Sequence, residues 1–165
     1  MRRMWGDDSV PRMSDYDTDV YAWSQRQGAL LRRLAAGERV NDADLDWPNI
    51  AEEIETVGRS ERSAVASHIA TIIEHLIKLQ ASPTVEPRAG WQITVVRARR
   101  DVQRLLRENP SIRPQIEATI VEELLAARKL AAMAMTAHNE IPIVDPQTLT
   151  YAQEQVLGEW FPDAA

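Results

Sequence analysis

Residues 46–81 read DWPNIAEEIETVGRSERSAVASHIATIIEHLIKLQA, and this stretch decides the fold. Its apolar residues recur every three or four positions, a spacing that predicts one buried face of an α-helix. Pro48 suits the first turn of a helix, Asp46 precedes it as a capping candidate, and Ser82-Pro83 ends the pattern. The predicted apolar stripe consists of Ile50, Ile54, Val57, Ala64, Val65, Ile69, Ile72, Leu76 and Leu79.

The length of this helix conflicts with the size of a compact domain. About 34 helical residues extend roughly 51 Å, whereas a compact chain of 165 residues is roughly 40 Å across. Gly58 is the weakest helix former in the segment, at a cost of about 1 kcal/mol relative to alanine. We therefore favour a bend or break near Gly58 over a straight helix that projects and packs against a partner chain.

The same periodicity predicts further helices on both sides. They cover residues 15–37, 89–108, 111–137 and 150–160, with one short turn at 41–45 and an extended segment at 141–149. Gly37 is expected to stop the first and Asn139 to end the third in left-handed geometry, and Thr150 with Gln153 is a capping-box pattern for the last. The apolar stripe of the first consists of Tyr16, Val20, Trp23, Leu30, Leu31 and Leu34. No strand or repeat is predicted, so the fold class is all-α: a helical bundle of about four principal helices with short terminal helices. Residues 1–14 lack any period and are predicted to form a flexible N-terminal tail, followed by a single helical domain over 15–165.

Composition narrows the function classes. The chain has no cysteine and a net charge of −6, which excludes thiolate chemistry and disfavours general binding to nucleic acid, because affinity for phosphates comes from basic surface. No apolar run approaches the roughly 18 residues that cross a bilayer, and the glycine motifs of nucleotide sites are missing. We expect a cytoplasmic protein with no membrane contact and no cofactor.

Ionisable residues interrupt the apolar stripe of residues 46–81. Glu61, His68 and His75 are seven residues apart, hence about 10.5 Å apart along one helix, so they cannot share one metal ion. We interpret these residues, together with Glu53, as a polar seam of separate structural layers. The alternative is a metal-assisted enzyme that uses His75 with Glu53 or Glu61.

A second candidate site is a basic ridge on the helix predicted at 89–108. Arg97, Arg100, Arg104 and Arg107 share one helical face opposite Trp91. A solvated face, or one paired with acidic residues, is the favoured interpretation. Nucleic-acid binding through this ridge is the alternative function.

Apolar residues outside the predicted stripes point to an interface. Ile93, Val96, Val121 and Leu125 would lie on outer faces of a simple bundle, and contiguous exposed apolar area marks interaction surfaces. The leading hypothesis is therefore a non-enzymatic protein-interaction module that binds a protein partner or associates with itself.

Several segments together form a recognisable pattern. They are YDTDVYAW from Tyr16, IAEEIETVGRSE from Ile50, HLIKL from His75, the Trp91-x-x-Thr94 pair and the turn Asn109-Pro110-Ser111-Ile112. On these residues the chain resembles the bacterial family catalogued as domain of unknown function 29. The resemblance implies a small, stand-alone α-helical bacterial protein, and it brings no established activity, cofactor or substrate.

Overall fold

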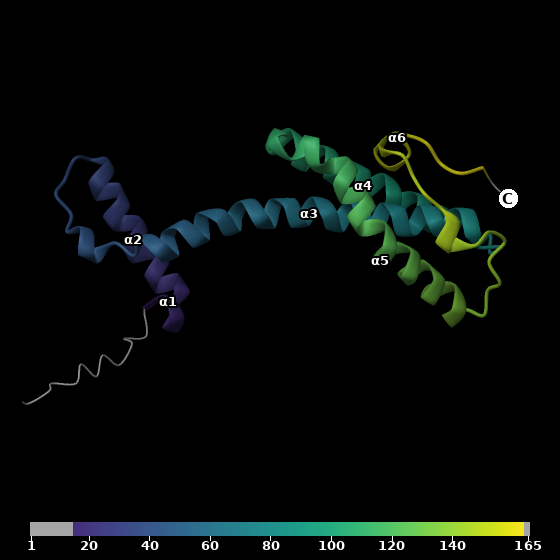
Figure 1. The fold of residues 1–165 in the computed structure, drawn as a ribbon, viewed down its shortest axis with the longest axis horizontal. Helices are drawn as coiled ribbons and strands as arrows, with labels where there is room; N and C mark the ends of the chain where they lie inside the picture. Colours follow the sequence, from purple (N-terminus) through teal and green to yellow (C-terminus); the bar gives the residue numbers. More distant parts are fainter. Residues whose placement is uncertain (1–14, 164–165) are drawn as a thin grey trace, which may run out of the picture. The chain divides into compact units, whose positions relative to one another are not determined.

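The computed structural model describes residues 15–163, so the predicted tail of residues 1–14 lies outside the described residues. The fold is all-α, and the described chain contains no strand (Figure 1). Contacts divide the chain into two compact units, one ending at Val57 and the other beginning at Gly58. The single domain over 15–165 stays a prediction, because a compact unit is not by itself an independently folding domain.

The first unit contains α1 (Asp15–Thr18), α2 (Val20–Ala35), the 3-10 turn η1 (Asp42–Asp44) and the first turns of α3 (Trp47–Ala81). The helix expected over 15–37 is interrupted at Asp19, whose φ of −155° leaves the helical region. Asp19 then caps α2, since its side chain accepts a hydrogen bond from the backbone N–H of Ala22 at 2.9 Å. The stop at Gly37 is confirmed by its left-handed φ of +79°.

The core of the first unit is small. Trp23, Leu45 and Ile50 are buried, and Tyr16 meets the Trp23 ring edge-on with 4.9 Å between centroids. The stripe predicted for the helix over 15–37 was wrong for Val20 and Leu34, which are 49% and 37% exposed. Both lie in α2 together with the buried Trp23, so the small core of this unit covers only part of the apolar side of the helix.

Helix α3 runs without interruption from Trp47 to Ala81, so the break considered near Gly58 does not occur. Ile54 and Val57 were predicted to be buried, but they are 67% and 65% exposed. Their positions fall where one compact unit ends and the next begins. The size conflict noted for a 35-residue helix disappears, because α3 supplies residues to two cores instead of crossing one.

The second unit packs the later part of α3 with α4 (Arg88–Glu108), the 3-10 segment η2 (Pro110–Gln115), α5 (Ile116–Ala137), η3 (Pro146–Thr148) and α6 (Gln153–Leu157). Figure 1 shows α4 and α5 alongside α3, with α6 close to α4. The fully buried side chains include Ile69, Ile72, Ile73, Leu76, Leu79, Val95, Val102, Ile116 and Val156. No described helix is long and apolar enough to span a membrane.

Two helix starts in the second unit differ from the prediction. Residues 110–115 form a 3-10 segment, so α5 begins at Ile116 and not at Ser111. The last helix is shorter than expected, and its cap is a bond from the Ala152 N–H to Gln155 Oε1 at 2.9 Å instead of the predicted Thr150 and Gln153 pair. In contrast, the predicted left-handed end of α5 is confirmed at Asn139, with φ of 56°.

Candidate functional site

The residues of the predicted polar seam are not brought together. Glu53 lies in the first unit, where the Tyr16 hydroxyl donates to it. Glu61 accepts from Asn109 Nδ2 at 3.1 Å, and His75 Nδ1 lies 2.9 Å from the carbonyl oxygen of Thr71 in its own helix. His68 is half-buried.

Three of the four seam residues therefore have different structural partners. Among residues 15–163, no group of three or more histidine, aspartate or glutamate side chains is placed to hold a metal ion.

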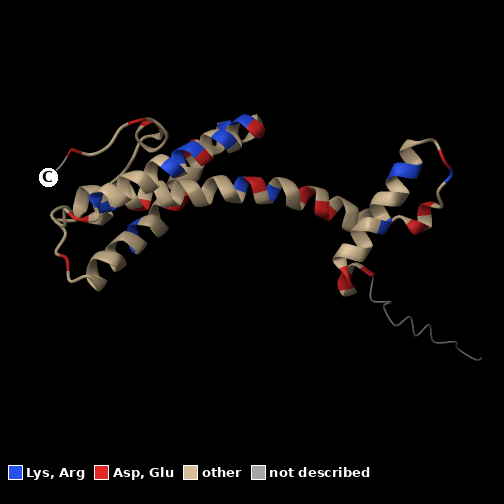
Figure 2. Ribbon diagram, turned by 180° about the vertical axis from the view of Figure 1, so that it is seen from behind, with Lys and Arg blue, Asp and Glu red and all other residues tan. Residues whose placement is uncertain are grey.

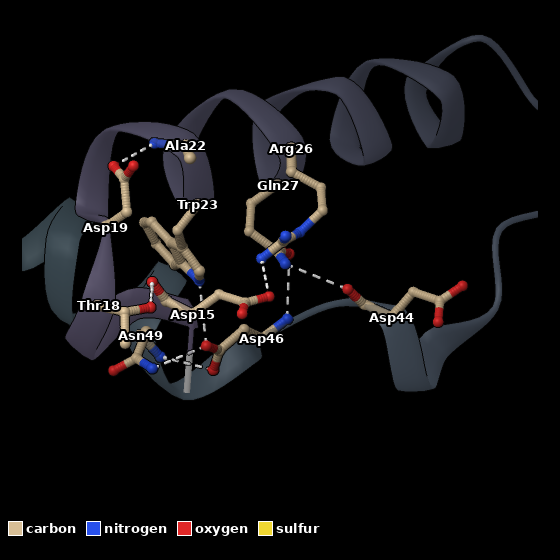
Figure 3. Close-up of polar contacts among 10 residues, drawn as sticks. All are labelled: Asp15, Thr18, Asp19, Ala22, Trp23, Arg26, Gln27, Asp44, Asp46 and Asn49. Atoms are coloured by element: carbon tan, nitrogen blue, oxygen red, sulfur yellow. Dashed lines mark hydrogen bonds and ion pairs between the residues drawn. The ribbon is translucent and has the colours of Figure 1, made fainter. Parts of the chain in front are cut away.

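A denser polar network lies in the first unit, at the start of α3 (Figure 3). Asp46 accepts from Asn49 Nδ2 at 2.7 Å and from Trp23 Nε1 at 3.1 Å, and these bonds hold the pKa of its carboxyl below the ordinary value. Gln27, only 5% exposed, donates to the carbonyl oxygen of Asp44 and accepts from the N–H of Asp46. These bonds fasten the connector to α2 and cap α3, so this network is structural.

The residues of the predicted basic ridge lie on the surface of α4. Arg97, Arg100, Arg104 and Arg107 are all exposed on α4, and Figure 2 shows positive residues along this helix. Arg104 also pairs with Glu108 at 3.2 Å. Arg104 also lies 4.0 Å from Asp101, so acidic neighbours accompany the ridge at this position.

A buried arginine on the same helix fixes the C-terminal segment. Arg99 donates to the carbonyl oxygens of Val156 at 2.9 Å, Gln155 at 2.7 Å and Trp160 at 2.7 Å, and its guanidinium lies 4.8 Å from the Phe161 ring centroid. Burial lowers the pKa of Arg99, and the charge of Glu159 opposes that effect. The result is a fixed cation that holds Phe161 beside α4.

The anchored segment and α4 together enclose two adjoining grooves. One, of 560 Å³, is lined by Ala89, Gln92, Ile93, Val96, Arg97 and Phe161. The other, of 440 Å³, is lined by Val96, Arg99, Arg100, Gln103, Gly158, Glu159 and Phe161. Val96 and Phe161 belong to both, so the grooves form one surface. We call it the α4 groove: an apolar floor with Arg97 and Arg100 at its edge.

A comparison with family models matches residues 16–161 to the family described as Domain of unknown function DUF29. The chain belongs to the DUF29 family. The resemblance read from the sequence segments is thereby confirmed. The comparison with curated proteins returned no match, and neither did the comparison with solved structures.

The segments that characterise this DUF29 chain meet each other in pairs. Tyr16 of the first segment bonds Glu53 of the second, and Glu61 at the end of the second bonds Asn109 of the turn before α5. Lys78 and Trp91 line a common hollow of 250 Å³. The two hydrogen bonds link separate helical segments, which gives these motif residues a structural role.

Several polar residues that organise the second unit were not predicted from the sequence. Lys78 pairs with Glu74 at 2.5 Å with both side chains largely buried, and Ser82 donates to Glu140 at 2.5 Å. Arg99 lies in the run Arg97-Ala98-Arg99-Arg100, and its burial was not predicted. A signal for it existed, because Arg99 is four residues after Val95 and three before Val102, which places it on the buried face of α4.

Proposed function

We propose that this DUF29 protein is a non-enzymatic interaction module whose α4 groove binds an acidic, amphipathic segment of a partner protein. One observation carries the proposal: the exposed apolar residues of α4 and its exposed arginines share one surface. Ile93 and Val96 are 51% and 55% exposed, and they flank Arg97 within the same groove.

The chemistry of this surface defines its ligand. Apolar side chains of a helical or extended segment would cover Ile93, Val96 and Phe161, and removal of that area from water supplies affinity. Carboxylates at the edge of the segment would meet Arg97 and Arg100, whose guanidinium groups can each donate two parallel hydrogen bonds to a carboxylate. The buried guanidinium of Arg99 prepares the site in advance, because it holds the C-terminal segment that forms one wall.

A synthetic peptide tests this proposal directly. We expect a helical peptide with leucine on one face and glutamate along its edge to bind in calorimetry, and a peptide of the same composition in scrambled order to bind at least about tenfold more weakly. Val96→Glu should abolish binding, because it places a carboxylate in the apolar floor. Equal affinity of both peptides, or unchanged affinity of Val96→Glu, would contradict the proposal.

The second candidate function is nucleic-acid binding through the whole basic ridge. The exposure of all four arginines along α4 favours it. Two double variants separate the candidates: Arg97→Glu with Arg100→Glu inside the groove, and Arg104→Glu with Arg107→Glu beyond it. A nucleic-acid site should lose affinity with either pair and show a steep salt dependence. An acidic peptide in the groove should respond mainly to the first pair.

A further inference from the structure

Helix α5 carries an apolar face that its own unit leaves uncovered. Val121, Leu125 and Met133 are 69%, 71% and 57% exposed. The opposite face of α5 is buried against the core through Ile116, Ile120, Ala127, Ala131 and Met135. A helix that is apolar on both sides is normally covered on both sides, so this outer face is a candidate for burial against another molecule.

This face is a shaped surface. Together with η3 it encloses a hollow of 910 Å³, lined by Glu122, Leu125, Ala126, Lys129, Ala132, Met133, Thr136, Ala137 and Gln147. Three of the lining side chains are alanine, which lets another helix approach closely. The two charged residues in the lining are Glu122 and Lys129.

The spacing of these two charges identifies the occupant. Glu122 and Lys129 are seven residues apart, nearly two full helical turns, so both lie on one line along the exposed face, between Leu125 and Met133 on the helical wheel. A two-fold axis between Leu125 and Ala126 would place a second α5 antiparallel to the first. Glu122 of each copy then lies level with Lys129 of the other across the interface, and Leu125 lies close to the axis.

We propose that two copies of this chain associate through the outer faces of their α5 helices, antiparallel about a two-fold axis. The face is self-complementary along the helix axis: Leu125 and Ala126 lie at its midpoint, and one acidic and one basic residue lie at equal distances on either side. This surface is separate from the α4 groove, so the dimer does not depend on the proposed ligand there.

One ion pair within the chain competes with the proposed pairs between Glu122 of one copy and Lys129 of the other. Arg62 of α3 pairs with Glu122 at 3.4 Å, with both side chains more than half exposed. An exposed pair at that distance is weak, and an antiparallel partner would compete for the same carboxylate. Arg62→Gln should therefore leave the dimer intact or tighten it slightly.

Sedimentation equilibrium across a range of protein concentrations tests the apolar centre. We expect a monomer–dimer equilibrium for the native chain and a monomer for Leu125→Glu. The matched control is Val85→Glu, since Val85 is equally exposed, at 72%, but lies outside α5. The control should remain dimeric, and circular dichroism should show the same helicity for all three proteins. A native chain that stays monomeric, or a Leu125→Glu dimer, overturns the proposal.

Charge exchange tests the antiparallel register, and it is best performed in the Arg62→Gln background so that residue 122 has no internal partner. Glu122→Lys or Lys129→Glu alone should raise the dissociation constant about tenfold, because two like-charged pairs then face each other. The double variant restores opposite charges at both pairs and should recover most of the affinity. A double variant no tighter than the single variants overturns this arrangement.

Discussion

At the scale of single residues, the structure is held by polar side chains that each join two segments. Asp46 is the clearest case, since one carboxylate caps α3 and receives the indole N–H of Trp23. The amide of Gln27 joins α2 to the connector before α3, and the guanidinium of Arg99 joins α4 to the C-terminal segment. Such groups stabilise mainly because their loss would leave a buried partner without a hydrogen bond.

The first prediction concerns Asp46. Asp46→Ala should destabilise the first unit by about 1–2 kcal/mol, the usual cost of a lost helix cap. Because folding lowers the pKa of Asp46 below 3.8, its ionised form stabilises the fold above that pH, and this stabilisation disappears as the pH falls through the folded-state value. Asp46→Asn keeps an acceptor and should flatten this acid dependence. Urea titrations followed by tryptophan fluorescence measure both effects, and an unchanged acid limb in Asp46→Asn would refute the assignment.

The second prediction concerns Tyr151, whose hydroxyl donates to Gln80 Oε1 at 3.1 Å. Burial raises its pKa far above 10.0, and the charge of Arg128 only partly opposes that effect. The neutral phenol therefore stabilises the fold below pH 10.0, and this contribution is lost as the pH rises above it. A Tyr16→Phe and Tyr21→Phe background leaves Tyr151 as the single tyrosine, so its ultraviolet absorbance should show ionisation together with unfolding. Ionisation near pH 10 without loss of helicity would contradict this prediction.

At the scale of helices, the caps and ends that depend on neighbouring residues were predictable, whereas the burial that depends on tertiary packing was not. The cap at Asp46, the stop at Gly37 and the left-handed Asn139 depend on a few neighbouring residues, and the sequence places them correctly. The exposure of Ile54 and Val57 depends on which helices surround them, and no periodicity encodes that. For the candidate site, the exposed arginines were predictable, but the groove depends on Arg99 and the returning C-terminal segment.

The C-terminal element gives a prediction with an internal control. A Cβ on Gly158 would lie 2.5 Å from the Glu154 carbonyl oxygen, too close for a rigid backbone. Gly158→Ala should therefore destabilise the second unit by about 1–3 kcal/mol and weaken ligand binding in the α4 groove, since Gly158 lines it. Gly58→Ala is the control, because it meets nothing within 4 Å inside α3 and should stabilise by about 0.5–1 kcal/mol. Equal thermal midpoints for the two variants would show that the Gly158 contact is unimportant.

At the scale of the whole molecule, α3 is one helix with two environments. From residue 51 to 64 every side chain is half-buried or exposed, whereas Val65, Ile69, Ile72, Ile73, Leu76 and Ile77 are at most 1% exposed. A helix of this length gains most of its stability from packing and not from backbone propensity. Its free energy of local opening should therefore change along its length.

Amide hydrogen exchange tests this difference within the one helix. Residues 52–63 should exchange through local opening, at rates well above those of residues 69–80, which should open only with the core of the second unit. Gly58→Ala should slow exchange around residue 58, because alanine favours the helix by about 1 kcal/mol, and should leave residues 69–80 unchanged. Uniform protection from residue 52 to 80 would mean that α3 opens as one cooperative element, and the two-environment description would then be wrong. If α5 also mediates dimer formation, raising the protein concentration should slow exchange in α5 and leave the gradient along α3 in place.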